Sequence, residues 1–347
     1  MLDITYETFA KNRASLTDRI RALRGNKEKD LKKYRQRWVD LDLKEKRAKI
    51  GAEDGSINHK KYKSIVLYAV NASAPVYNGK ICEAQFSDID ILYPYREIKD
   101  RLDIYRTIFE FKASLKVLDK VDLFLVDGSI YSDLIAPRNL GAGLDEKGRR
   151  EVMEFLPEIE DSDEVEIVSK RLAPKIKGPN RFGKIAFMEY LEYLSTLKTF
   201  IEKGADKVVG VSKTASTSSF GEGIPDIAVF DEVSTGAGYG FAEEKEKILQ
   251  KRFPVYGEFF NSYVPFFKYF YARLERNKGV LMIEVPRDIK EKEIVDLLCK
   301  IRSISVDGYP YLLRKAHKDV VISNRDIERF AASLGIRGLT GREALAW

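Results

Sequence analysis

Cysteine and histidine are scarce in this chain, with two of each among 347 residues. Cys82 and Cys299 lie far apart in the sequence and form no CxxC pair, so neither a disulfide framework nor a zinc knuckle is supported. No apolar run approaches the roughly 18 residues needed to span a bilayer, and the N-terminal segment lacks the apolar region of a signal peptide. We therefore expect a cytoplasmic protein that does not bind membranes.

Positive charge is concentrated in one segment. The formal net charge is +6, but residues 11–49 hold 15 Lys and Arg against 6 Asp and Glu, a local charge of +9 that leaves −3 for the rest of the chain. A basic segment of this kind favours a polyanion such as nucleic acid, because binding releases counterions. A solvated helix without any partner explains the same charges equally well.

The N-terminal segment, residues 1–47, is predicted to be mostly helical. Leu16, Ile20 and Leu23 follow one another at helical spacing, and the remaining faces are charged. A stripe this narrow suits an element that projects from the core or packs on a partner. We therefore interpret residues 1–47 as a basic helical arm that contacts DNA or a second subunit.

The rest of the chain, residues 48–347, is predicted to form one α/β domain. Its first elements are expected to be strands at 48–56 and 64–72 with a turn between them, a third strand within 74–92, a helix over 96–119 and a buried strand that ends at Asp127. Residues 137–180 contain four prolines and an acidic run, which indicates an irregular surface insertion. After it come a helix at 183–203, a strand at 207–213, a strand hairpin within 265–285 and a largely helical C-terminal region.

Two Asp-Gly-Ser tripeptides begin at Asp54 and Asp127, each at or near the end of an expected strand. Three opening strands, a long helix and a strand that ends in Asp match the layout of the ribonuclease-H-like fold, a mixed β-sheet flanked by helices. In that layout the helix supplies a third carboxylate, and Glu110 suits this role because it lies in the polar stripe of the helix. Taken singly, an Asp-Gly pair is more often a plain turn, and Glu110 fits a solvated stripe equally well.

Three neighbouring carboxylates would repel one another unless a cation neutralised them, and oxygen ligands favour Mg²⁺ or Mn²⁺ over zinc. Such ions could activate a water molecule and assist the leaving 3′-oxygen of a phosphodiester, so the predicted reaction is hydrolytic strand cleavage. His317 could add a nitrogen ligand, which would favour Mn²⁺, or carry a proton. A plain surface histidine explains it equally well.

These segments together resemble the archaeal NurA nuclease family, over roughly residues 48–335. The segments that carry the resemblance are AEDGS, the helix with Glu110, LFLVDGS, FGEGIPDI and, most specifically, GYPYLLRKAHKDV. The first motif reads DGS where some relatives have DGGS, which alters the turn and leaves the ligand in place. The resemblance places the family's catalytic residues on Asp54, Glu110, Asp127, Tyr309 and His317, with the three acids and His317 as metal ligands.

The same resemblance implies a ribonuclease-H-like nuclease domain that depends on Mn²⁺ and forms a homodimer. It implies single-strand endonuclease activity and 5′-to-3′ exonuclease activity on single- and double-stranded DNA. The implied partner is a HerA-type hexameric, DNA-translocating ATPase, and the implied process is DNA end resection for recombinational repair.

Other residues have less certain roles. Lys213 could contact the scissile phosphate, although a structural or solvated lysine is the simpler interpretation. Asp226 could be a further carboxylate near the metal or a turn residue after Pro225. A run of aromatic residues could stack the bases of a single strand, but alternation along a strand favours core or dimer interface. These are Tyr256, Phe259, Phe260, Tyr263, Phe266, Phe267, Tyr269, Phe270 and Tyr271.

Two other functions fit parts of the pattern. A non-catalytic accessory subunit would bind an ATPase and DNA through the basic arm, but retention of all five candidate site residues argues against it. A metal-dependent phosphatase would act on small phosphate esters, whereas the basic arm favours a polymer.

Overall fold

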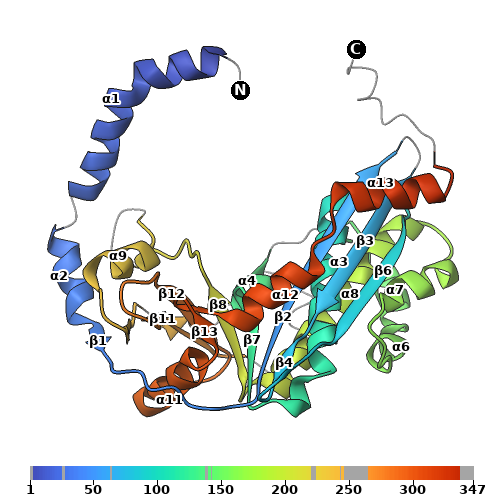
Figure 1. Ribbon diagram of the computed structural model, residues 1–347. Helices are drawn as coiled ribbons and strands as arrows, with labels where there is room; N and C mark the ends of the chain where they lie inside the picture. Colours follow the sequence, from blue (N-terminus) through green and yellow to red (C-terminus); the bar gives the residue numbers. More distant parts are fainter. Residues whose placement is uncertain are drawn as a thin grey trace.

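The computed structural model describes residues 3–25, 28–62, 65–136, 140–141, 143–219, 224–242, 244–245 and 265–336. Within this part of the chain, one mixed sheet of 12 strands runs through the molecule (Figure 1). In order across the sheet, its main path is β1 (Trp38–Asp40), β9 (Gly238–Gly240), β11 (Phe267–Arg273), β12 (Leu281–Val285), β8 (Val208–Ser212), β7 (Leu123–Asp127), β2 (Ile50–Lys61), β3 (Val66–Ser73) and β6 (Gln85–Leu92). Short strands β4 (Val76–Tyr77), β5 (Ile81–Cys82) and β10 (Glu244–Lys245) pair beside this path.

Helices cover the sheet and extend from it. They are α1 (Asp3–Gly25), α2 (Glu28–Gln36), α3 (Ile98–Leu115), α4 (Ile130–Ile135), α5 (Glu146–Met153), α6 (Leu156–Glu160), α7 (Val168–Leu172), α8 (Arg181–Gly204), α9 (Asp226–Val233), α11 (Glu291–Arg302), α12 (Tyr311–Val320) and α13 (Asn324–Ser333). A two-stranded ribbon of β13 (Ser305–Val306) and β14 (Tyr309–Pro310) leads into α12.

The half of the sheet that contains β2 has the predicted ribonuclease-H-like layout. Strands β2, β3 and β6 form an antiparallel meander, and after α3 the chain returns as β7, which pairs with β2 in parallel. After α8 the chain returns again as β8, parallel to β7. The three opening strands, the long helix and the strand that ends at Asp127 are therefore confirmed.

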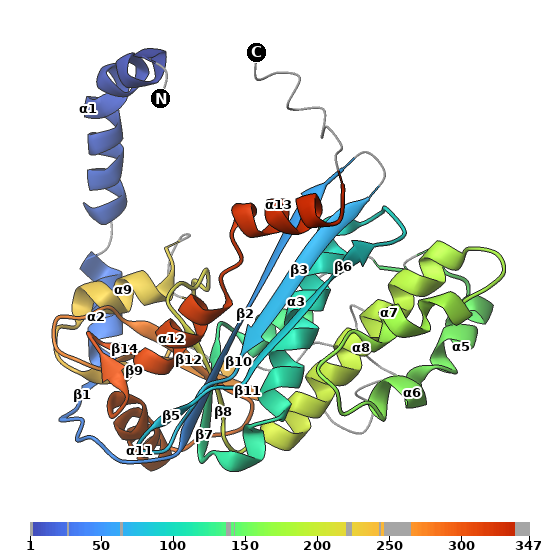
Figure 2. The same ribbon diagram turned by 45° about the vertical axis from the view of Figure 1, so that its right-hand side comes forward.

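Helices pack on both faces of this half-sheet (Figure 2). On one face, α3 and α8 bury apolar side chains such as Phe109 and Leu194 against Val70 and Phe124. On the other face, α11 and α12 bury apolar side chains against Leu125 and neighbouring strand residues. Strand β7 is buried up to Val126, and its sequence is correspondingly apolar, whereas β2 is buried only over residues 50–53 and is polar and partly exposed beyond them.

Two expectations for the N-terminal half are wrong in detail. Strand β2 continues to Lys61 and pairs with β3 along residues 54–61, so most of the segment expected to be a turn between the first two strands, including His59, is itself part of a strand. The N-terminal helices end at Gln36, and the following β1 pairs with β9 at the far edge of the sheet. Trp38, which the predicted helical arm of residues 1–47 included, belongs to that strand, and it is buried because its aromatic ring packs on Phe230.

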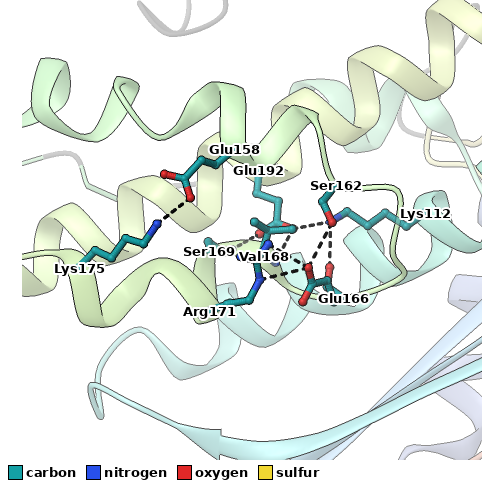
Figure 3. Close-up of polar contacts among 9 residues, drawn as sticks. All are labelled: Lys112, Glu158, Ser162, Glu166, Val168, Ser169, Arg171, Lys175 and Glu192. Atoms are coloured by element: carbon teal, nitrogen blue, oxygen red, sulfur yellow. Dashed lines mark hydrogen bonds and ion pairs between the residues drawn. The ribbon is translucent and has the colours of Figure 1, made fainter.

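The segment expected to be an irregular insertion at 137–180 instead contains the helices α5, α6 and α7, which pack on α8. Val152 and Leu172 of this segment are fully buried in the same core as α3 and α8. Figure 3 shows the polar anchor: the buried Glu192 carboxylate of α8 accepts hydrogen bonds from the backbone of Val168 and Ser169 at the start of α7 and pairs with Lys112 of α3. Local composition predicted a loop, but apolar burial and this anchor order the chain.

The hairpin within 265–285 is confirmed as β11 and β12, which pair in antiparallel register. The side chains of Phe267, Tyr269, Phe270 and Tyr271 are buried, so core packing explains this part of the aromatic run. Tyr256, Phe259, Phe260 and Tyr263 lie outside the described residues. In the part of the chain that the structure describes, no helix has the length and apolarity to cross a membrane.

Candidate metal centre

Two carboxylates meet where the parallel pairing of β2 and β7 ends. Asp127 is the last residue of β7, and Gly128 after it adopts a positive φ of 136°, which glycine permits at a turn. Asp54 directly follows Glu53, the last β2 residue paired with β7. Asp54 is therefore not at a strand end as expected, since β2 continues beside β3, but it does lie at the same edge of the parallel ladder as Asp127.

Helix α12 and the strand before it complete the group from the C-terminal part of the chain. The His317 Nδ1 atom lies 2.7 Å from the Asp54 Oδ2 atom. The Tyr309 hydroxyl donates a hydrogen bond of 3.2 Å to Asp127 Oδ1. Four of the five predicted site residues, distant in sequence by up to 263 positions, are thus brought into direct contact in two pairs.

Asp54, Asp127 and His317 form a group that could hold a cation. Each offers a ligand atom, and these atoms all lie within 4.8 Å of one another. Both carboxylate side chains are largely buried, while the His317 side chain is 66% exposed. Two carboxylate oxygens and one imidazole nitrogen are a donor set that suits Mn²⁺ and other divalent ions, and the exposed side of the group leaves room for further ligands.

Glu110 of α3 approaches this group from the other side of β2. Its carboxyl lies against the backbone of Gly55, where an added Cβ would come within 2.5 Å of Glu110 Oε1. Burial is the main cause that raises the Glu110 pKa to about 7, with Asp133 and Asp54 adding to the rise and the paired Arg106 opposing it. Glu110 does not belong to the group whose ligand atoms lie within 4.8 Å of one another. Its carboxyl lies against Gly55, the residue that follows Asp54.

The charges around the centre favour a cation. Burial raises the pKa of Asp54, and the Asp127 carboxylate adds to the rise although the hydrogen bond with His317 opposes it. Burial likewise raises the pKa of Glu53 well above its usual value, helped by Glu110 and Asp54. Carboxyl groups crowded in this way resist ionisation until a positive charge compensates them, and this is the physical reason why the group could bind a metal ion.

Two glutamates that the sequence analysis did not single out support the centre. Glu53 is buried, and its Oε1 atom accepts a hydrogen bond of 3.3 Å from the backbone N–H of Asp127. Glu284 of β12 is fully buried and accepts hydrogen bonds from the Ser129 hydroxyl at 2.7 Å and the Tyr131 backbone at 2.8 Å. For Glu284 the available signal was a lone carboxylate inside the apolar strand LMIEV, because a buried charge without a partner is costly, whereas Glu53 stands beside Asp54 in a polar sequence and gave no such signal.

Lys213 and Asp226 differ in their relation to the centre. The Lys213 ammonium lies 3.6 Å from Asp127 Oδ2 and 4.4 Å from the centroid of the Tyr309 ring, and its side chain is half exposed. The Asp226 carboxylate is fully buried at the start of α9, where it accepts hydrogen bonds from Tyr34 and Ser219. Lys213 thus belongs to the site, whereas the contacts of Asp226 support the structural interpretation.

Fold and site together define a ribonuclease-H-like α/β protein with an acidic, histidine-containing group that is a candidate centre for a divalent cation. A family model described as the NurA domain matches residues 48–322. The chain therefore belongs to the NurA nuclease family. The Methanocaldococcus jannaschii protein described as a probable DNA double-strand break repair nuclease NurA is 30% identical over 375 residues, which cover 98% of this chain and 91% of that protein.

Other relatives agree over the full length. The DNA double-strand break repair nuclease NurA of Sulfurisphaera tokodaii is 26% identical over 345 residues, covering 97% of this chain and 96% of that protein. The crystal structure of the NurA nuclease from Sulfolobus solfataricus superposes with a TM-score of 0.78 at 19% identity, covering 97% of each chain. A crystal structure of NurA bound to dAMP and manganese superposes with a TM-score of 0.70 at 16% identity, covering 98% of this chain and 99% of that one. The part of the chain that the structure describes thus adopts the NurA fold.

Proposed function

We propose that this protein is a manganese-dependent DNA nuclease that hydrolyses phosphodiester bonds. The observation that carries the proposal is the convergence of Asp54, Asp127 and His317 at one edge of the sheet, in a chain of the NurA family. Asp54, Glu110, Asp127 and His317 would hold the ion. When bound, Mn²⁺ supplies Lewis acidity and a more acidic water molecule, and Mg²⁺ is the alternative ion.

The neighbouring side chains have roles that follow from their contacts. Burial holds the pKa of Tyr309 above its usual value, and Asp127 adds to this, so the phenol stays protonated and orients the Asp127 carboxylate as a hydrogen-bond donor. The half-exposed Lys213 ammonium is placed to contact a DNA phosphate beside Asp127. Glu53 holds the backbone N–H of Asp127, and Glu284 holds the Ser129 hydroxyl and the backbone N–H of Tyr131.

The finer activity is proposed from the family resemblance. We expect 5′-to-3′ exonuclease activity on single- and double-stranded DNA and endonuclease activity on single strands, in end resection for recombinational repair. We also propose a homodimer and a HerA-type hexameric ATPase as partner. The exposed α1, whose described side chains at residues 3–20 all face solvent, supports a role of the arm in subunit or DNA contact.

The test is cleavage of end-labelled single- and double-stranded DNA with Mn²⁺, Mg²⁺ or EDTA. Asp54→Asn and Asp127→Asn each remove one ligand charge and should lower the rate by about 100-fold or more, a loss typical of removing a group that stabilises the transition state. Asp161→Asn on the exposed surface is the matched control and should leave the rate unchanged. Circular dichroism would verify that each variant is folded.

Two outcomes would favour the other functions. Wild-type protein that binds DNA but fails to cut it in the presence of either metal would favour an accessory subunit. Hydrolysis of nucleoside monophosphates faster than of polynucleotides would favour a phosphatase. The intact set of five site residues argues against the accessory subunit. The basic N-terminal segment argues against the phosphatase, because it favours a polyanionic polymer.

A further inference from the structure

A buried carboxylate at the start of α9 joins parts of the chain that are distant in sequence. The Asp226 side chain is fully buried. Its Oδ1 atom accepts hydrogen bonds from the Tyr34 hydroxyl of α2 and, at 2.9 Å, from the backbone N–H of Ser219. Its Oδ2 atom accepts hydrogen bonds of 2.9 Å from the Ser219 hydroxyl and 3.4 Å from the Tyr271 hydroxyl of β11. Because a buried carboxylate needs such donors, the contacts hold α2, β11 and the Ser219 backbone together.

The same residue fixes the far end of the loop at residues 213–219. The backbone N–H of Asp226 donates a hydrogen bond of 2.8 Å to the Thr217 carbonyl, so the loop is bonded to both the side chain and the backbone of Asp226. Within the loop, Ala215 packs against the apolar cluster that contains Phe230. Most other side chains of the loop are exposed. The Asp226 contacts are therefore a principal restraint on its position.

The near end of the loop lies at the candidate metal centre. Lys213 directly follows β8, and its ammonium lies 3.6 Å from Asp127 Oδ2 and 4.4 Å from the centroid of the Tyr309 ring. The lysine side chain is half exposed, and a half-exposed ion pair contributes too little to hold a long, flexible side chain by itself. For Lys213 to meet a phosphate reproducibly, the backbone that carries it has to be fixed by other contacts.

Helix α2 connects this loop with the basic N-terminal segment. It packs on α9, and the two helices lie side by side in Figure 1. Tyr34 of α2 is buried at Asp226, whereas its neighbours Lys32 and Lys33 are exposed. The helix thus presents cations to a polyanion on its outer side and donates a hydrogen bond to the loop anchor on its inner side.

We propose that Asp226 is a positioning residue for DNA cleavage, which anchors the 213–219 loop so that Lys213 meets the DNA phosphate. Through Tyr34, the same anchor makes the position of the loop depend on α2. Since Asp226 is fully buried, it does not touch DNA, and its effect on cleavage passes through Lys213. The inference rests on the proposed nuclease function and names the residue that joins the basic segment to the centre.

A double-mutant cycle tests whether Asp226 acts through Lys213. Asp226→Asn keeps the shape of the side chain but places a donor where the carboxylate only accepts. The kcat/KM for single-stranded DNA with Mn²⁺ should fall about tenfold, as expected for one charge-assisted hydrogen bond, and equally in Lys213→Gln. The double variant should match Lys213→Gln within about twofold, because both changes remove the same contact. A double variant about 100-fold slower than wild type would overturn the proposal, since independent losses multiply.

Two further readouts separate positioning from a general loss of stability. The slope of log kcat/KM against log salt concentration should become shallower by about 0.7 in Asp226→Asn and in Lys213→Gln, the value for one phosphate contact on a single strand. Hydrogen exchange of residues 213–219 should be faster in Asp226→Asn, whereas Lys213→Gln leaves the anchor intact and should exchange like wild type. A wild-type slope or wild-type exchange in Asp226→Asn would overturn the proposal.

Two other variants cover the case in which Asp226→Asn does not fold. Ser219→Ala and Tyr34→Phe each remove one hydroxyl that donates to Asp226. Each should lower kcat/KM about threefold, as expected for one neutral hydrogen bond, and should have no effect when Lys213 is already Gln. Wild-type kcat/KM in both variants would overturn the proposal.

The control is Asp231→Asn, which lies on the same helix but pairs with Arg273 instead of the loop. This variant should keep the wild-type kcat/KM, salt slope and exchange of residues 213–219. An impaired Lys213→Gln beside an unimpaired Asp226→Asn would overturn this inference alone. Absence of metal-dependent cleavage by wild type would overturn the nuclease function, and hydrogen exchange would still decide whether Asp226 holds the loop.

Discussion

Gly55 shows how one missing side chain shapes the centre. Asp-Gly pairs usually form turns, yet Gly55 lies within β2 and pairs with Ala72 of β3. Its role is steric, because the Glu110 carboxyl occupies the space that a Cβ would need. The glycine thereby brings a third carboxylate next to Asp54 through the thickness of the sheet.

Gly55→Ala should therefore displace Glu110. An added Cβ would lie 2.5 Å from Glu110 Oε1 and 2.8 Å from Cδ, so we expect a loss of about 1–3 kcal/mol in the free energy of unfolding and weaker Mn²⁺ binding. Thermal unfolding and electron paramagnetic resonance of Mn²⁺ would measure the two effects. Combining Gly55→Ala with Glu110→Ala should restore stability but not metal affinity, and Gly279→Ala, in open space, should change neither. An equally stable Gly55→Ala protein would contradict the steric explanation.

The Glu110 carboxyl also makes stability depend on pH in the metal-free protein. Its pKa in the folded state is about 7, above the value of 4.5 for an ordinary glutamate. A raised pKa stabilises the fold at low pH, and this contribution is lost as pH rises from about 4.5 through about 7. At about 1.4 kcal/mol for each pKa unit, wild type should lose on the order of 3 kcal/mol relative to Glu110→Gln over this window.

Melting temperatures of both proteins in EDTA, measured from about pH 4 to about pH 8, would check this, because that range includes the whole window in which stability should change. The difference between the two proteins is the decisive quantity, because other titrating groups are common to both. A difference that stays constant with pH would contradict burial of an ionisable Glu110. Saturating Mn²⁺ should flatten the profile of wild type.

At the scale of elements, the short helices of 146–172 depend on one buried carboxylate. Glu192 is fully buried and accepts hydrogen bonds from Val168 and Ser169 at 2.9 and 2.8 Å, and from Lys112 at 2.6 Å (Figure 3). Glu192→Ala leaves the Lys112 charge and two backbone donors buried without this partner. We expect a loss of about 3–5 kcal/mol, together with faster hydrogen exchange in α5, α6 and α7.

The control is Glu158→Ala, which removes a pair with Lys175 that is about half exposed on both sides. This variant should lose less than about 1 kcal/mol, because exposed ion pairs contribute little. Equal losses for the two variants would mean that the segment is held by apolar packing alone.

The elements also show what the sequence could and could not predict. The meander, α3 and β7 were predictable because their side-chain periods are strong and local, and the position of Asp127 followed from them, whereas Asp54 lies inside a longer β2 than expected. The approach of His317 to Asp54 depends on how α12 crosses the sheet, which no local period encodes, so only the family resemblance indicated it. Composition misled for the 137–180 segment, because its proline and acidic residues hide the buried contacts of Val152 and Leu172.

At the scale of the whole molecule, α1 projects away from the sheet (Figure 1). Its apolar side chains Ile4, Tyr6 and Phe9 are 67%, 60% and 58% exposed. Tyr34 and Trp38, a short distance along the chain, are by contrast buried at 1% and 6% exposure. The N-terminal segment therefore has an outer part, whose described side chains at residues 3–20 are exposed, and an inner part that belongs to the core.

Deletion of residues 1–25 should leave the melting temperature within about 2 °C of the full chain, because it removes no buried side chain of the described residues. If α1 joins two copies, light scattering should show a monomer in place of a dimer. Deletion of residues 1–40 is the control and should destabilise the fold, since it also removes Tyr34, Trp38 and β1. A shortened protein that remains dimeric would exclude α1 as the subunit contact and leave DNA or the ATPase as its partner.

The pairing of β1 with β9 has a consequence for biosynthesis. Trp38 pairs with Gly240, about two hundred residues later in the chain. At roughly 5–20 residues per second, a ribosome needs on the order of 10–40 seconds to supply that partner strand. During this interval the arm is already outside the ribosome and unattached, so neighbouring nascent chains on one messenger could meet through their arms before either sheet is closed.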